Sequence, residues 1–177
     1  MIPDALPRRA FLLGSLALAG CATLPPSPTG ETLPITLADA FTGRTTGRGV
    51  FRNSITGAER RFRADLNGRL RGDTLTVVED FTYDDGQVDR LTWVFTRAGE
   101  GRWTGKREDT VGLAEVVEMG REVRLTYLAD FRSPGRVTRL GFADVIYRLP
   151  DGPVVNEGVV MKSGIPVGTV RFEIRRA

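Results

Sequence analysis

The sequence alternates apolar and charged residues in short runs that are separated by glycine-containing turns. In one clear run, Val123, Leu125 and Tyr127 alternate with Arg124 and Thr126. Successive side chains of a β-strand point to opposite faces, so this period predicts a strand with one face in a core. Roughly nine or ten such runs follow one another, which is the pattern of an antiparallel all-β domain.

The connections between these runs are too short for crossover helices, and long helical patterns are absent. Consecutive strands joined by tight turns lie next to each other as an antiparallel meander. Closing such a sheet removes its two exposed edges. We therefore predict one domain over residues 41–177, an antiparallel meander that forms a closed or nearly closed barrel, with a two-sheet sandwich as the alternative.

The first residues of the chain have the layout of a secretory signal. The pair Arg8 and Arg9 precedes an apolar run that is too short to span a bilayer, and residues 18–21 read Leu-Ala-Gly-Cys. This tetrapeptide resembles the lipobox of bacterial lipoproteins, whose cysteine becomes the acylated first residue. The resemblance implies a signal peptide over residues 1–20 and lipidation of Cys21, the one cysteine in the sequence.

Two or more acyl chains anchor a protein stably, so we expect attachment to a membrane through the N-terminal lipid. The expected location is the bacterial cell envelope, facing the periplasm. Ala22 stands where an aspartate is typical of inner-membrane retention, which favours the outer membrane. Arg8 and Arg9 also resemble a twin-arginine export motif, and the sequence leaves export by that route or by the general secretory route open.

Residues 21–40 contain four prolines and several Ser and Thr residues, and we expect them to form a flexible tether between the lipid and the barrel. Two features of this segment instead favour ordered structure next to the barrel. Leu33, Ile35 and Leu37 are spaced so that they begin to pack on the edge of the domain. The segment Leu37–Phe41 is also compatible with one turn of helix.

The sequence contains no histidine, and acylation would consume the one cysteine. These two facts exclude Ser-His-Asp and Cys-His triads and most zinc and iron sites. We expect no cofactor and no metal, and an enzyme built on this chain would use carboxylates, Lys, Tyr or Ser. The 25 basic and 22 acidic residues include no basic block with interleaved aromatic residues, so nucleic acid is not an expected partner.

Two motifs are weak signals of ligand binding. The glycine-rich stretch 43–49 lacks the lysine and the strand–loop–helix context of a phosphate-binding loop, so it predicts the entry into a first strand. Asp84 and Asp85 lack the ligand spacing of a calcium loop, and with Gly86 they predict a tight hairpin turn.

Glu79 is the residue that most clearly breaks the apolar pattern, because it shares a strand face with Val77 and Phe81. A buried carboxylate needs a partner or takes a raised pKa, and such groups gather at functional sites. Arg90 on the next strand is one possible partner, and a structural ion pair or a β-bulge is the alternative.

Asp109 would complete a carboxylate pair with Glu79 for acid–base chemistry. The aromatic residues are expected in the core or around an apolar pocket. The candidate ligand-binding residues are Glu79, Tyr83, Arg90, Trp93, Asp109 and Tyr127.

Several of these motifs together resemble one protein family. They are the stretch Phe81–Gly86, Trp93, Gly105, the stretch Asp109–Ala114, Tyr127 and the closing segment Gly164–Arg175. In this order they resemble DUF3833, a family of bacterial lipoproteins of unknown function, over roughly residues 41–176. The resemblance implies an envelope lipoprotein with a lipocalin-like or related β-barrel and no established activity.

Three functions are compatible with these observations. The first is a non-enzymatic, membrane-anchored barrel that binds an apolar or lipid ligand. The second is a structural lipoprotein that binds another envelope protein, whose identity the sequence does not give. The third is a carboxylate-based enzyme acting on envelope lipids, with Glu79 and Asp109 as acid and base.

Overall fold

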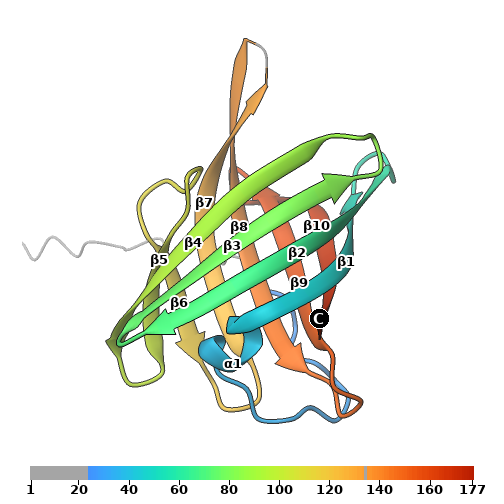
Figure 1. The fold of residues 1–177 in the computed structure, drawn as a ribbon. Coiled ribbons are helices and arrows are strands. Elements are labelled where there is room, and N and C mark those ends of the chain that lie inside the picture. Colours follow the sequence, from blue (N-terminus) through green and yellow to red (C-terminus); the bar gives the residue numbers. More distant parts are fainter. Residues whose placement is uncertain (1–23, 134) are drawn as a thin grey trace, which may run out of the picture.

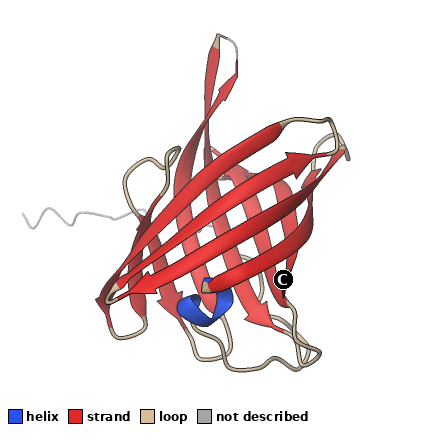
Figure 2. Ribbon diagram, viewed as in Figure 1, coloured by secondary structure: helices blue, strands red, loops and turns tan. Residues whose placement is uncertain are grey.

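The computed structural model describes residues 24–133 and 135–177, so the predicted signal peptide and Cys21 lie outside the described residues. Antiparallel strands form a closed barrel with one short helix at one end (Figures 1 and 2). The elements are α1 (Leu37–Phe41), β1 (Gly43–Asn53), β2 (Glu59–Arg71), β3 (Thr74–Tyr83), β4 (Val88–Gly99), β5 (Arg102–Lys106), β6 (Ala114–Glu118), β7 (Val123–Ser133), β8 (Arg136–Arg148), β9 (Val154–Lys162) and β10 (Ile165–Arg176).

Each strand pairs with its neighbours in the chain, and β1 pairs with β10 to close the barrel. The predicted all-β antiparallel barrel is therefore confirmed, and the sandwich alternative is wrong. Closure depends on a long register between the first and last strands, from Thr45 opposite Arg176 to Asn53 opposite Gly168. These backbone hydrogen bonds leave no free edge in the described sheet, because every strand has two partners.

The interior is formed by alternate residues of every strand. Residues directly opposite each other in an antiparallel pair point to the same side, so Leu66, Glu79 and Leu91 face inward together. The largest side chains that are almost fully buried include Trp103, Phe95 and Leu75. They belong to one core cluster with Leu37 of α1, in the half of the barrel next to that helix.

Helix α1 covers this end of the barrel, which we call the closed end. Thr36 caps the helix, and its side chain and that of Asp39 form a reciprocal capping box. Leu37 is fully buried in the core. The carboxylate of Glu118 accepts hydrogen bonds from the backbone N–H of Leu37 at 2.8 Å and from the indole N–H of Trp103 at 2.9 Å. The alternative in which residues 37–41 form a helical turn is confirmed.

The segment before α1 packs on the outside of the barrel. Leu33 forms an isolated β-bridge with Arg148, and the Arg124 side chain donates to the backbone carbonyl of Pro25. Residues 24–40, which we expected to be a flexible tether, are thus attached at several points where the structure describes them. The physical reason is the apolar outer face of β8 and β9, where Val145 and Val155 point outward and are nevertheless fully buried.

The other end of the barrel is open, and five connections surround it. They are residues 54–58, 84–87, 107–113 and 163–164 and the turn that joins β7 to β8. The hairpin of β7 and β8 continues its pairing up to Ser133 opposite Arg136 and projects beyond the other strands (Figure 1).

We expect Leu37→Ala to lower the free energy of unfolding by about 2–4 kcal/mol, because it leaves a cavity where α1 meets the core. Leu113→Ala is the matched control, because Leu113 is 61% exposed and its truncation is expected to cost about 0.5 kcal/mol or less. Urea unfolding of both variants measures the difference. Equal effects would show that α1 does not seal the barrel.

Candidate functional site

A buried arginine lies at the centre of the barrel interior. Arg107 follows β5, and its side chain is only 9% exposed. It holds Asp109 through two hydrogen bonds, from Nε to Oδ1 at 2.7 Å and from Nη2 to Oδ2 at 2.9 Å. Its Nη1 atom lies 3.8 Å from Oε2 of Glu79 on β3. An arginine keeps its charge under all ordinary conditions, so the interior contains a permanent cation.

Two aromatic rings pack against this cation. The guanidinium carbon of Arg107 lies 4.8 Å from the ring centre of Trp93 and 5.3 Å from that of Tyr127. The Tyr127 ring is in turn stacked on Phe142, with 4.7 Å between the ring centres. Attraction between a cation and an aromatic face strengthens when water is excluded, so the rings help to stabilise the buried charge.

Glu79 is the first of two buried carboxylates with strongly perturbed acidity. Burial raises the pKa of Glu79 to about 7, the charge of Arg107 partly opposes this rise, and Asp109 adds to it. A carboxyl group with a pKa near 7 exchanges its proton at physiological pH.

Asp144 on β8 is the second buried carboxylate whose acidity is strongly perturbed. Burial raises the pKa of Asp144 to about 7, against the influence of Arg107 and of a hydrogen bond from Asn156. Gly158 on β9 lies directly opposite Asp144 in the register. A methyl group at Gly158 would overlap with the Asp144 carboxylate, so glycine at this position makes room for the acid.

These residues, Glu79, Arg107, Asp109, Asp144 and Asn156, form what we call the Arg107 cluster. The cluster has more hydrogen-bond acceptors than donors, because three carboxylates surround one guanidinium. The Oδ1 atom of Asn156 is buried and has no hydrogen-bond partner among the described residues. In the same part of the chain no group of acidic residues is arranged to hold a metal ion.

Two groups of aromatic side chains line the interior next to this cluster, because Phe81 follows Glu79 on the inner face of β3 and Tyr127 contacts Arg107. Phe62 contacts Phe81, Tyr83 and Phe172, with ring centres 5.6 Å, 6.2 Å and 5.2 Å apart. With Tyr127 and Phe142, these residues form what we call the aromatic collar. Phe62 and Phe81 are only partly buried, so part of each ring remains free to contact a ligand.

Four of the six candidate residues from the sequence meet at this site: Glu79, Trp93, Asp109 and Tyr127. Tyr83 lies nearer the open end, where the Arg60 guanidinium is 3.7 Å from its ring centre. Arg90 points out of the barrel and pairs with Asp80 at 2.8 Å. Arg90, which the sequence offered as one possible partner of Glu79, does not pair with it, because the register places Leu91, not Arg90, on the inner face opposite Glu79.

Arg107 and Asp144 were not among the site residues predicted from the sequence. Asp144 had a visible signal, since it is the one acidic residue within the apolar stretch Leu140–Leu149. Arg107 had none, because it follows the short strand β5 in a run of charged residues, Lys106 to Asp109, that reads as an exposed loop.

The glycine-rich stretch 43–49 lies within β1, as expected for an entry into the first strand. Gly47 and Gly49 face the interior, where the rings of Phe172 and Phe62 lie against their backbone.

The outer face of β10, β1 and β2 carries an open hollow of about 970 Å³ that is lined by arginines and acidic residues. Two of these arginines, Arg171 and Arg175, form ion pairs with Glu157 and Glu173.

Comparison with protein families gives a clear result. A family model described as a protein of unknown function, DUF3833, matches residues 15–176. The chain belongs to the DUF3833 family. No curated protein matches the sequence. The family assignment confirms the resemblance found in the sequence and carries no established activity.

Among solved structures, the barrel is similar to an S-type phycobiliprotein lyase, CPES, from Guillardia theta. The TM-score is 0.58, the sequence identity is 11%, and the match covers 77% of this chain and 88% of the lyase chain. At this identity the similarity concerns the fold alone.

The two raised pKa values predict how stability depends on pH. Glu79 and Asp144 have folded pKa values of about 7, against ordinary values of 4.5 and 3.8. Between roughly pH 4 and pH 7 the folded state therefore binds more protons than the unfolded state, and the stabilisation from these groups is lost as the pH rises. We expect Glu79→Gln to gain stability relative to wild type by up to about 1.4 kcal/mol per pH unit in this window. Urea unfolding across the window measures the gain, and a constant difference would contradict it.

We expect Gly158→Ala to lower the free energy of unfolding by about 1–3 kcal/mol, because the added methyl group displaces the Asp144 carboxylate. In an Asp144→Ala background the same substitution is expected to cost at least about 0.5 kcal/mol less, because the obstructing oxygens are gone. A double-mutant cycle by urea unfolding measures this coupling. Additive effects would show that Gly158 and Asp144 do not share the space.

Proposed function

We propose that this protein is a lipid-anchored envelope protein whose barrel binds an apolar or lipid ligand at its open end without transforming it. The observation that carries the proposal is the position of the aromatic collar: Phe81 follows Glu79 on the inner face of β3 toward the open end, and Tyr127 contacts Arg107. A collar of this kind covers the apolar body of a ligand, and the polar groups below it fix the ligand's orientation.

The Arg107 cluster selects the polar end of the ligand. Arg107 already donates two hydrogen bonds to Asp109, whereas the Oδ1 atom of Asn156 is a buried acceptor without a partner, and Glu79 and Asp144 are acceptors when ionised. A ligand end with O–H or N–H donors satisfies these acceptors, and a buried acceptor without a donor is unfavourable. The proposed ligand is therefore amphipathic, with a donor-bearing polar end and an apolar body.

The envelope location rests on the sequence before the barrel. Lipidation of Cys21 would attach the protein permanently through its acyl chains. The described helix α1 is too short to cross a bilayer, and no other described helix is long and apolar enough to do so. We place the protein on the periplasmic side of the envelope, at the outer membrane, because Ala22 follows the cysteine.

The carboxylate-enzyme alternative is favoured by one observation, the two carboxyl groups whose pKa is about 7. In this alternative Glu79 and Asp144 exchange the proton, in place of the expected pair of Glu79 and Asp109, because Asp109 is held by Arg107. Lipid turnover that is lost in Glu79→Gln would support the enzyme. Full turnover in that variant would exclude it.

We expect native mass spectrometry of protein purified from its own host to show a co-purifying amphipathic lipid. Combined Phe62→Ala and Phe81→Ala substitutions remove contact area from the collar, and each lost ring is expected to weaken binding by about 1 kcal/mol or more. Val94→Ala is the control, because Val94 is 42% exposed on the outer face of β4. Equal lipid occupancy in both variants, or a wild-type protein without lipid, would contradict the proposal.

A further inference from the structure

The open end of the barrel carries exposed apolar side chains on every one of its five connections or directly beside them. These side chains, which we call the apolar rim, are Ile55 (76% exposed), Val88 (71%), Leu113 (61%), Phe131 (45%), Val137 (55%) and Ile165 (66%). Isolated exposed apolar residues are normal on protein surfaces, but a set gathered around one opening marks an interaction site.

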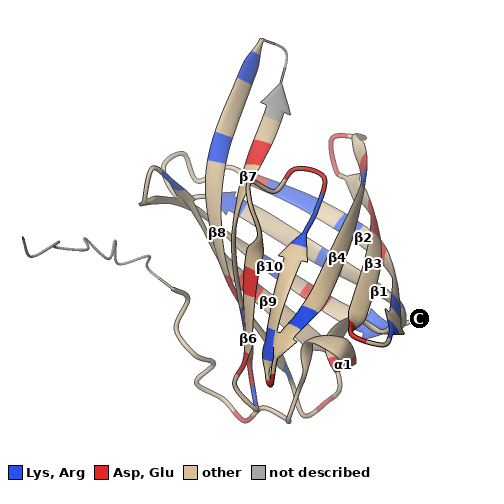
Figure 3. Ribbon diagram, turned by 90° about the vertical axis from the view of Figure 1, so that its left-hand side faces the viewer, with Lys and Arg blue, Asp and Glu red and all other residues tan. Residues whose placement is uncertain are grey.

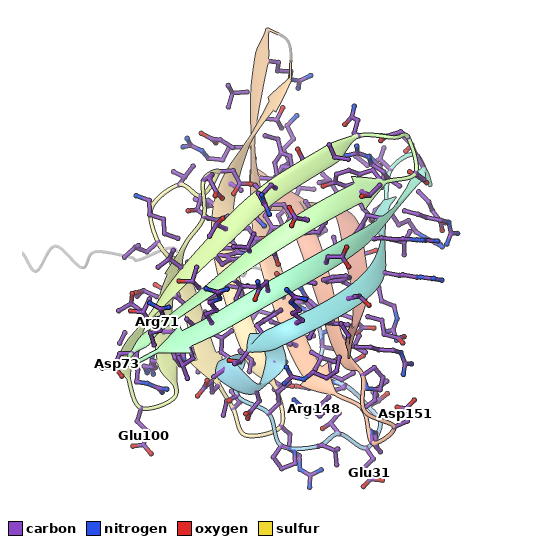
Figure 4. All side chains as sticks on the ribbon, viewed as in Figure 1. Glu31, Arg71, Asp73, Glu100, Arg148 and Asp151 are labelled. Atoms are coloured by element: carbon purple, nitrogen blue, oxygen red, sulfur yellow. The ribbon has the colours of Figure 1, made fainter. Side chains whose placement is uncertain are left out.

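The closed end is different. Its turns carry charged side chains such as Arg71, Asp73, Glu100 and Asp151, which project from the barrel in Figure 4. Of the large apolar side chains on or beside the described closed-end turns, Met119 (59%) and Leu70 (40%) are exposed. The contrast shows that the apolar rim belongs to one end of the barrel and is not a general property of its turns.

Cationic side chains accompany the rim on the two hairpins that carry Val137 and Ile165. Arg136 precedes Val137, and Lys162 lies opposite Ile165 in the register. Figure 3 shows the basic residues of β8 along the projecting hairpin. Two acidic residues, Asp84 and Asp85, lie on the β3–β4 turn beside the rim residue Val88. Asp85 pairs with Arg60 at 2.8 Å, and Asp84 accepts a hydrogen bond from a backbone N–H.

We infer that the open end docks on the surface of a lipid bilayer that contains anionic lipid. The rim residues are placed to enter the interface between headgroups and acyl chains, and Arg136 and Lys162 to contact the anionic headgroups. This inference goes beyond ligand binding, and it stands whether or not the interior holds a lipid.

A bilayer suits this arrangement better than a protein partner or a second copy. The apolar residues are distributed around the whole opening and not concentrated on one side of it. The projecting hairpin of β7 and β8, which carries Phe131 and Val137 beside Arg136, would enter the lipid surface first, and the rim residues on the other connections would follow. A globular partner seated on the opening would instead need a complementary ring. Docking would also bring the aromatic collar next to the acyl chains.

The test uses a chain that begins at Ala22, which retains every described strand pair and removes the acyl anchor as a source of binding. The rim variant combines Ile55→Ser, Val137→Ser and Ile165→Ser. The matched control combines Leu70→Ser, Val94→Ser and Met119→Ser, three exposed apolar residues away from the rim. Co-sedimentation with vesicles of phosphatidylethanolamine and phosphatidylglycerol measures the partition coefficient, and circular dichroism confirms that each variant is folded.

We expect wild type and the control to bind and the rim variant to bind at least about tenfold more weakly, because three apolar side chains no longer enter the lipid. No binding by wild type, or equal binding by all three proteins, would overturn the inference. Size-exclusion chromatography without vesicles provides a second criterion. A wild-type dimer that the rim substitutions convert to a monomer would show that the rim binds a second copy, which would also overturn it.

Discussion

The guanidinium of Arg107 is a buried charge that cannot be removed by an ordinary change of pH, and the central part of the interior is arranged around it. Asp109 holds it with two hydrogen bonds, Glu79 approaches it, and Trp93 and Tyr127 cover its faces. Removing one partner of a buried ion pair commonly costs about 3–5 kcal/mol, because it leaves an uncompensated charge. The cluster is therefore part of the fold as well as a candidate binding site.

This buried cluster divides the barrel into two parts. Toward α1, close packing around Trp103 and Phe95 and the hydrogen bonds of Glu118 give a conventional core. Toward the open end, packing gives way to the partly exposed rings of the collar and then to the apolar rim. Close packing is concentrated at one end and exposed apolar surface at the other, which fits the proposed entry of a ligand through the opening.

Alternation along the strands was enough to predict the barrel, because each strand has one face in the core and pairs with its neighbours in the chain. It was also enough to find Glu79, a carboxylate on an inner face. Applied strictly, the same rule places Arg90 outside, since Leu91 and Trp93 face inward. Arg90 has the complementary charge but lies at an outward-facing position of β4, so charge alone does not identify the partner of Glu79.

Other features depend on contacts between distant segments, which local patterns do not contain. Strand β8 is apolar on both faces because the N-terminal segment passes over its outer side, as the bridge between Leu33 and Arg148 shows. The same packing explains why residues 24–40 are not a free tether where they are described. The Arg107 side chain lies inside the barrel because it forms ion pairs there with Asp109 and Glu79. A run of charged residues after a short strand does not indicate that one of them is buried.

The most direct test of the central claim is a high-resolution crystal structure of protein purified from its host membranes without removal of lipid. The account predicts elongated density between the rings of Phe62 and Phe142, ending within hydrogen-bond distance of Glu79 or Asp144. Rings that have closed over the cluster and fill the open end, with no density between them, would contradict it.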